Sequence, residues 1–238
     1  RHNASRAAWI YALGIVAVMC VLFFVNNILL MMLAIMAYML IFNYIARYRA
    51  SCMIPITKLL YEQCDPEACI SAIVYYSTRN GKIRLTNQAL MAQCLIYLND
   101  PQLAQDVLIT YPRKDAASVL TYWSLMSYVY YLLKDESGLE RSYEEAQKVR
   151  LNFGHTGVMI RSEELNSIKN RLDLMNGDFS ECKRYFLQSL KTAVFPFQKA
   201  DADYYIGLIS FVQQDYSLAA MYFNQVVQTG GKLYFVQN

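Results

Sequence analysis

The sequence predicts an all-α protein in which a transmembrane helical hairpin precedes an α-solenoid of about five antiparallel helix pairs. Two observations predict this fold class. Residues 7–46 contain no Asp, Glu, Lys or Arg, whereas all 19 acidic residues lie at or beyond Glu62. Beyond Arg49 the apolar residues recur at helical spacing, and turn signals return at intervals of 35, 35, 43 and 37 residues. Such intervals are typical of arrays of helix pairs.

The uncharged N-terminal segment is too long for a single membrane pass. As one helix, residues 7–46 would reach about 60 Å, twice the roughly 30 Å of a hydrocarbon core. Asn26 and Asn27 interrupt the segment, which predicts passes at about 8–25 and 28–46 within a hairpin domain 1–49. A cleaved signal peptide, or a lipoprotein signal ending at Cys20, fits less well because the apolar run continues past Cys20 and the large Met19 precedes it.

The charges that flank the hairpin predict its orientation. Arg1 and Arg6 precede the first pass and Arg47 and Arg49 follow the second, whereas the turn between them is uncharged. Positively charged flanks favour the cytoplasmic side of a membrane. The sequence therefore predicts an integral membrane protein with both termini and the repeat domain in the cytoplasm, and with the lipid bilayer as one partner.

The composition argues against several classes of function. Residues 47–238 carry 20 basic and 19 acidic side chains, which is no electrostatic footprint for nucleic acid. Six cysteines without a repeated CxxC spacing and only two histidines do not predict a zinc site, and free thiols suit a reducing compartment. No catalytic motif is present, and the paired acids Glu144-Glu145 and Glu163-Glu164 are expected on solvated helix faces. We therefore expect no enzyme activity, no cofactor and no metal.

An aspartate is expected to begin the second helix of each pair. These aspartates are Asp65, Asp100, Asp135, Asp178 and Asp215. A carboxylate at this position accepts hydrogen bonds from the free amides of the first turn and favours the positive helix end. Pro66 and Pro101 suit the first helical position, and Glu181 predicts a capping-box-like arrangement with Asp178.

Residues four and eight positions after each aspartate predict how the paired helices pack. The first is mostly small and the second is large, in the pairs Cys69 and Ile73, Ala104 and Leu108, Leu139 and Tyr143, Cys182 and Phe186, and Ala219 and Phe223. A small side chain lets two helix backbones approach closely, and the large one fills the neighbouring layer.

The segment 202–223 carries this pattern most fully, with Gly207, Tyr216, Ala219 and Phe223 at characteristic positions. On these residues the sequence resembles the tetratricopeptide repeat (TPR) family over about residues 50–230, although Asn170 stands where the fourth unit would have its glycine. The resemblance implies a right-handed superhelix whose first helices line a concave groove for a protein or peptide. Residues 231–238 would begin a further helix.

The spacing of first-helix residues from the helix-capping aspartates predicts which of their side chains face this groove. The predicted partner-binding residues are Gln93, Tyr128, Tyr131, Arg171, Tyr204, Leu208 and Phe211. Further inward-facing positions are Lys58, Tyr61, Ile96, Ser124, Ser167 and Leu174. Tyrosine supplies a large contact area at a small cost in rotamer entropy, and the alternative is that individual tyrosines are core residues between layers.

These expectations combine into a membrane-anchored adaptor or scaffold that binds a protein or peptide in the groove at the cytoplasmic membrane surface. The alternatives are a sensor module that responds to a peptide or small molecule, and an accessory region of a larger enzyme. Residues 151–160, which include His155, make the third connection longer than the others and are expected to form a surface loop.

Overall fold

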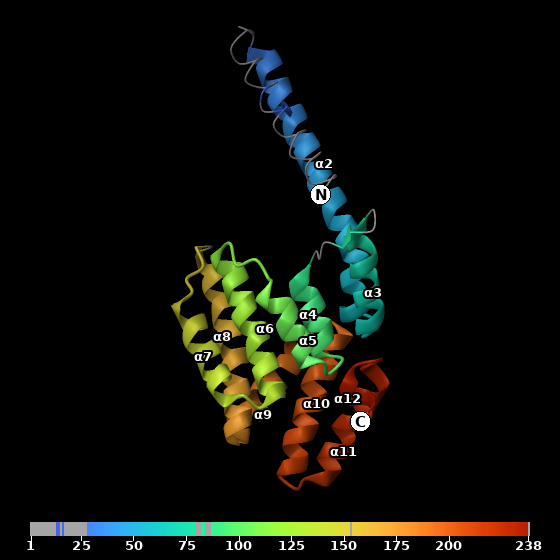
Figure 1. Ribbon diagram of the computed structural model, residues 1–238, viewed down its shortest axis with the longest axis vertical. Helices are drawn as coiled ribbons and strands as arrows, with labels where there is room; N and C mark the ends of the chain where they lie inside the picture. The colour runs from blue at the N-terminus through green and yellow to red at the C-terminus, as the bar shows by residue number, and fades with distance from the viewer. Residues whose placement is uncertain are drawn as a thin grey trace. The chain divides into compact units, whose positions relative to one another are not determined.

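The computed structural model describes residues 13, 14, 16, 28–79, 82, 83, 87–152 and 154–237. Within these residues the protein is all-α, apart from a hairpin in which β1 (Thr78–Arg79) pairs antiparallel with β2 (Lys82–Ile83) (Figure 1). The chain divides into two compact units, Arg1–Pro55 and Ile56–Asn238.

Helix α2 (Ile28–Tyr61) provides most of the described residues of the first unit and continues into the second. Gly14 is helical, and a Cβ at this residue would lie 3.0 Å from the Tyr38 ring. Gly14 therefore lies against α2. Most of the first predicted pass, 8–25, and the predicted Asn26-Asn27 turn are outside the described residues.

The predicted localisation as an integral membrane protein is wrong. Among the residues that the structure describes, no helix combines the length and the apolarity that a membrane pass requires. The predicted placement of the repeat domain in the cytoplasm depended on that localisation and is corrected with it.

The second unit is built from helices that pack against their neighbours in the chain. They are α3 (Pro66–Ser77), α4 (Gln88–Ile96), α5 (Pro101–Ile109), α6 (Ala116–Leu133), α7 (Glu136–Lys148), α8 (Gly154–Asn176), α9 (Phe179–Thr192), α10 (Pro196–Val212), α11 (Tyr216–Thr229) and α12 (Tyr234–Gln237). Helix α4 packs on α5, α6 on α7, α8 on α9 and α10 on α11, and further contacts join α6 to α8 and α9 to α10. The all-α, helical-repeat-like character predicted from the sequence is confirmed.

The predicted helix-capping aspartates behave as expected with one exception. Backbone amides three residues further on donate to Asp65, Asp100, Asp135 and Asp215 at distances between 2.9 and 3.2 Å. Asp178 makes no capping hydrogen bond, although its Oδ1 accepts from the Ser180 hydroxyl at 3.2 Å. Glu181 pairs with Arg184, so the predicted capping-box-like arrangement is absent.

The small residues of the second helices lie in the core, as the spacing predicts. Cys69, Ala104, Leu139 and Cys182 are fully buried, and Ala219 is 2% exposed. A Cβ at Gly207 would come 2.8 Å from the Phe223 ring. The first-helix glycine and the large residue of the last pair are therefore in direct contact.

Helix α8 begins earlier than the sequence predicts. Residues 154–160, expected to belong to a surface loop, form the first turns of this helix. Arg161 in the following turn donates to the carbonyl oxygens of Val149 at 2.7 Å and Gln147 at 2.6 Å. Gln147 lies in the last turn of α7 and Val149 directly follows it, where the helix itself offers no backbone donor to the carbonyl groups. Arg161 therefore joins the end of α7 to the start of α8.

Candidate binding pocket

The second unit contains a pocket of about 490 Å³ between α6, α8, α9 and α10. Its wall includes Tyr128, Ser167, Arg171 and Leu174, which come from two different helices and were all predicted to face inward. The other lining residues are Glu163, Glu164, Asn166, Asn170, Tyr185, Phe186, Gln188, Ser189, Thr192, Ala193, Phe197, Gln198, Asp201, Ala202 and Tyr205. The volume lies within the range of ligand-binding clefts.

Asp201 on α10 is the centre of a hydrogen-bond network at the pocket. The Tyr97 hydroxyl donates to its Oδ1 at 2.7 Å, and the Tyr128 hydroxyl donates to the same oxygen at 3.1 Å. The Tyr205 hydroxyl lies 2.9 Å from that of Tyr128 and is the donor in this contact, because the Tyr128 proton is engaged by Asp201. Burial raises the pKa of Asp201, and the two tyrosine hydroxyls and the charge of Arg171 offset only part of this effect.

Arg171 on α8 is held in a fixed position over an aromatic ring. Its guanidinium carbon lies 4.3 Å from the centre of the Tyr128 ring, and its Nη1 donates to the Ser127 hydroxyl at 3.2 Å. Stacking of this kind orients the planar guanidinium group. No carboxylate in the described part of the chain forms an ion pair with Arg171, which lines the pocket.

The ionisable groups of the pocket wall are mostly carboxyl groups. Glu163, Glu164 and Asp201 line it together with one cation, Arg171. Glu164 also accepts a hydrogen bond from the Ser124 hydroxyl, which fixes one of its oxygens. This balance complements a ligand that carries a basic group. Glu163 is exposed, as predicted for the Glu163-Glu164 pair, but both residues contribute to the pocket wall.

The structure brings Tyr128 and Arg171 together in the pocket and places the other predicted groove residues elsewhere. Tyr131 is buried, with its ring centre 6.3 Å from that of Tyr205. Tyr204 stacks on Phe235 with a centroid distance of 4.4 Å.

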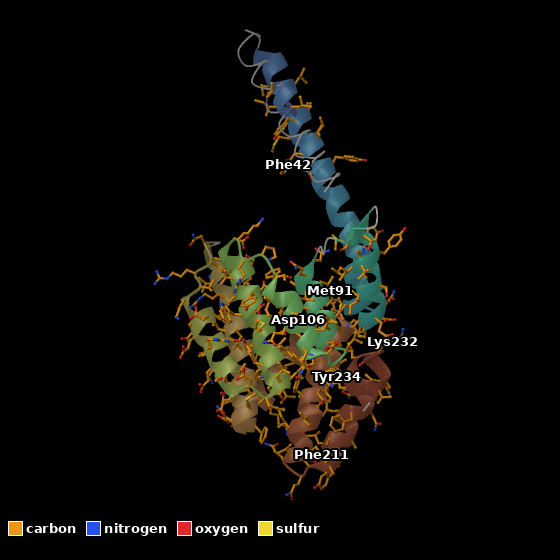
Figure 2. All side chains as sticks on the ribbon, viewed as in Figure 1. Phe42, Met91, Asp106, Phe211, Lys232 and Tyr234 are labelled. Atoms are coloured by element: carbon orange, nitrogen blue, oxygen red, sulfur yellow. The ribbon has the colours of Figure 1, made fainter. Side chains whose placement is uncertain are left out.

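The remaining predicted residues lie outside the pocket wall. The Oε1 of Gln93 accepts from the Tyr61 hydroxyl at 2.8 Å. Leu208 is partly exposed. Phe211 is 54% exposed at the end of α10, where its ring contacts Tyr216 at 5.6 Å (Figure 2).

The inward positions of the first helix pairs are covered by the start of α10. The Tyr61 ring lies 5.8 Å from that of Phe195 and 5.4 Å from that of Phe197. Phe197 also contacts Tyr97 edge to face at 4.5 Å. Side chains of the chain itself therefore occupy the space next to Tyr61 and Tyr97.

The sequence-based prediction missed two residues that shape the pocket. Asp201 precedes Tyr204 by three positions and Leu208 by seven, so helical spacing places it on the same face of α10 and could have identified it. No spacing in the sequence identifies Phe197, because its place in the pocket wall depends on contact with Tyr97, about 100 positions earlier.

Within the described residues, no group of three or more His, Cys, Asp or Glu side chains is placed to hold a metal ion. Cys64, Cys69, Cys94 and Cys182 are free and buried. The pocket therefore offers hydrogen-bonding, charged and aromatic groups for a ligand. Comparison with protein-family models, with curated protein sequences and with solved structures found no match to this chain.

Proposed function

We propose that the second unit is a TPR-like adaptor module that binds a protein segment in the pocket between α6, α8, α9 and α10. The observation that carries the proposal is that inward positions of two successive first helices, Tyr128 on α6 and Arg171 on α8, line one pocket. The resemblance to the TPR family supports it, since the helix pairs of that family stack into a right-handed superhelix that binds peptides on its concave side. We propose the same right-handed superhelical arrangement for the helix pairs of this chain.

The chemistry of the pocket favours a segment with a basic side chain. Three carboxyl groups and one guanidinium surround it, and Phe197 and Tyr205 provide aromatic contact for the carbon chain of a lysine or arginine. Asp201 is already oriented by two tyrosine hydroxyls, so little ordering is needed when a ligand binds.

Site-specific photocrosslinking in cells tests the proposal. A photoreactive residue replaces Gln188, which is exposed and lines the pocket, or Gln102, which is exposed on α5 and does not line it. We expect a covalent adduct with a partner protein only at position 188, and a loss of most of that adduct when Glu163→Gln is added. Equal adducts at both positions, or an unchanged adduct with Glu163→Gln, would exclude the pocket as the binding site.

A small-molecule ligand is a second candidate because the pocket volume of about 490 Å³ also suits such a ligand. A ligand that binds only the folded state raises the melting temperature. The dialysable fraction of a cell extract should then stabilise the purified chain and lose its effect with Asp201→Asn. An adaptor would respond only to the macromolecular fraction.

A further inference from the structure

We infer that residues 231–236 are an intramolecular ligand, bound in a docking site that accepts protein segments carrying a glycine, a basic residue, an apolar residue and an aromatic pair in that order. We call Gly231–Val236 the tail segment. The tail site is the surface that holds it, formed by Cys64 and Asp65 after α2, by Tyr97 after α4 and by Tyr204 on α10. This inference is independent of the pocket described above.

Two backbone hydrogen bonds fix the register of the tail segment. The amide of Lys232 donates to the Cys64 carbonyl at 2.9 Å, and the amide of Tyr234 donates to the Tyr97 carbonyl at 3.0 Å (Figure 2 labels Lys232 and Tyr234). The carbonyls are 33 positions apart in the sequence, so the tail segment bridges the first two helix pairs. Main-chain bonds of this kind give affinity that does not depend on side-chain identity.

Glycine is required at the first position of the tail segment. Gly231 has a φ of +55°, and a Cβ there would lie 2.9 Å from the Cβ and from the carbonyl oxygen of Cys64. Both the backbone conformation and the close approach therefore exclude other residues. The tail site thus selects for a glycine directly before the basic residue.

The side chains that follow supply the remaining specificity. The Lys232 ammonium group lies 2.7 Å from Asp65 Oδ2, and Glu67 adds a second carboxylate at 3.9 Å. Leu233 is fully buried, and Phe235 is 7% exposed. Phe235 stacks on Tyr204 with a centroid distance of 4.4 Å and an interplanar angle of 11°.

The tail segment is ordered by these contacts rather than by its own helix. The described part of α12, Tyr234–Gln237, is a short helical segment, and its position is set by its contacts with the rest of the unit. Gly230 and Gly231 join it to α11. A short segment held in this way can leave its site while the helices stay folded, and a partner segment of the same chemistry can then occupy the vacated site.

Thiol labelling of the full chain tests the inference, because Gly231 covers Cys64, which is 1% exposed. Labelling with a maleimide is resolved by cysteine in a mass spectrometer, and the fully buried Cys182 on α9 reports on global unfolding. We expect Gly231→Ala to raise the labelling rate of Cys64 at least tenfold and to leave Cys182 unchanged. A synthetic peptide of residues 230–238 should restore protection, whereas the same peptide with Gly231→Ala should not.

Two results would overturn the inference. One is that Cys64 stays protected in Gly231→Ala, and the other is that the wild-type peptide fails to protect the released site. If Cys182 becomes labelled as well, the variant has unfolded, and hydrogen exchange of the wild-type chain then tests the inference. In hydrogen exchange, the amides of Lys232 and Tyr234 in the wild-type chain should exchange at least tenfold more slowly than in the free peptide. Exchange at the free-peptide rate would equally refute a bound tail segment.

Discussion

Gly207 shows how one missing methyl group sets the packing of the last helix pair. Alanine normally favours a helix over glycine by about 0.5 to 1 kcal/mol. At position 207, however, a Cβ would come 2.8 Å from the Phe223 ring, and overpacking of this kind costs about 1 to 3 kcal/mol. We predict that Gly207→Ala lowers the free energy of unfolding by about 1 to 2 kcal/mol in urea denaturation.

The size of Phe223 provides the control for this prediction. In the double variant Gly207→Ala with Phe223→Leu, the new methyl group has room, so the total loss should be smaller than the sum of the two single losses. Additive losses would show that the close approach at Gly207 is not the cause.

Asp203 makes stability depend on pH. It is 4% exposed, its Oδ1 has no hydrogen-bond partner among the described residues, and burial raises its pKa to about 6, with Lys199 opposing the change. An unfolded aspartate titrates near pH 4. Between about pH 4 and 6 the folded chain therefore keeps a proton that the unfolded chain has released. The contribution of the protonated group to stability is fully present below pH 4 and is lost as the pH rises through about 6.

We predict that Asp203→Asn is more stable than the wild-type chain by about 2 kcal/mol at pH 7 and nearly equal to it at pH 4. Urea denaturation at both pH values measures the difference. Asp106→Asn, at an exposed position on α5, is the matched control and should show no such change between the two pH values (Figure 2). If the free energies of unfolding of the wild-type chain and Asp203→Asn differed by the same amount at both pH values, the raised pKa assigned to Asp203 would be contradicted.

At the scale of the helix, capping distinguishes two aspartates that look alike in the sequence. Asp135 accepts from the Gly138 amide at 2.9 Å, whereas Asp178 accepts from the Ser180 hydroxyl and, among the described residues, from no amide of its helix. Loss of a capping side chain costs about 1 kcal/mol. We predict that Asp135→Ala lowers the free energy of unfolding by about 1 kcal/mol and Asp178→Ala by less than about 0.5 kcal/mol. Equal losses in urea denaturation would show that Asp178 caps α9 in solution.

Local signals in the sequence predicted where helices begin better than they predicted which residues line the pocket. Asp65, Asp100 and Asp215 begin their helices because capping is decided within four residues. The start of α8 was missed because Arg161 satisfies the end of α7 through a contact across the connection. Of the predicted groove, Tyr128 and Arg171 meet because they lie on successive first helices.

At the scale of the second unit, contacts between distant parts of the chain separate this protein from a simple linear array. In such an array each repeat touches only its neighbours, and stability is a sum of local terms. Here Phe197 contacts Tyr97, and the Tyr97 hydroxyl donates to Asp201. The carbonyl of Tyr97 also holds the tail segment. No sequence spacing encodes these contacts, because they depend on how far the helix pairs rotate as they stack.

These contacts predict that α4 and α10 lose structure together. Phe197 is 5% exposed and packs on both Tyr61 and Tyr97, and truncation of a buried phenylalanine costs about 3 to 5 kcal/mol. We expect Phe197→Ala to remove about 3 kcal/mol and to accelerate amide exchange in both helices. Phe195→Ala is the matched control because Phe195 is 38% exposed and contacts only Tyr61 among these rings, so it should remove less than about 1 kcal/mol. If Phe197→Ala accelerated exchange in α10 and left α4 protected, the two ends of the unit would be energetically separate despite their aromatic contact.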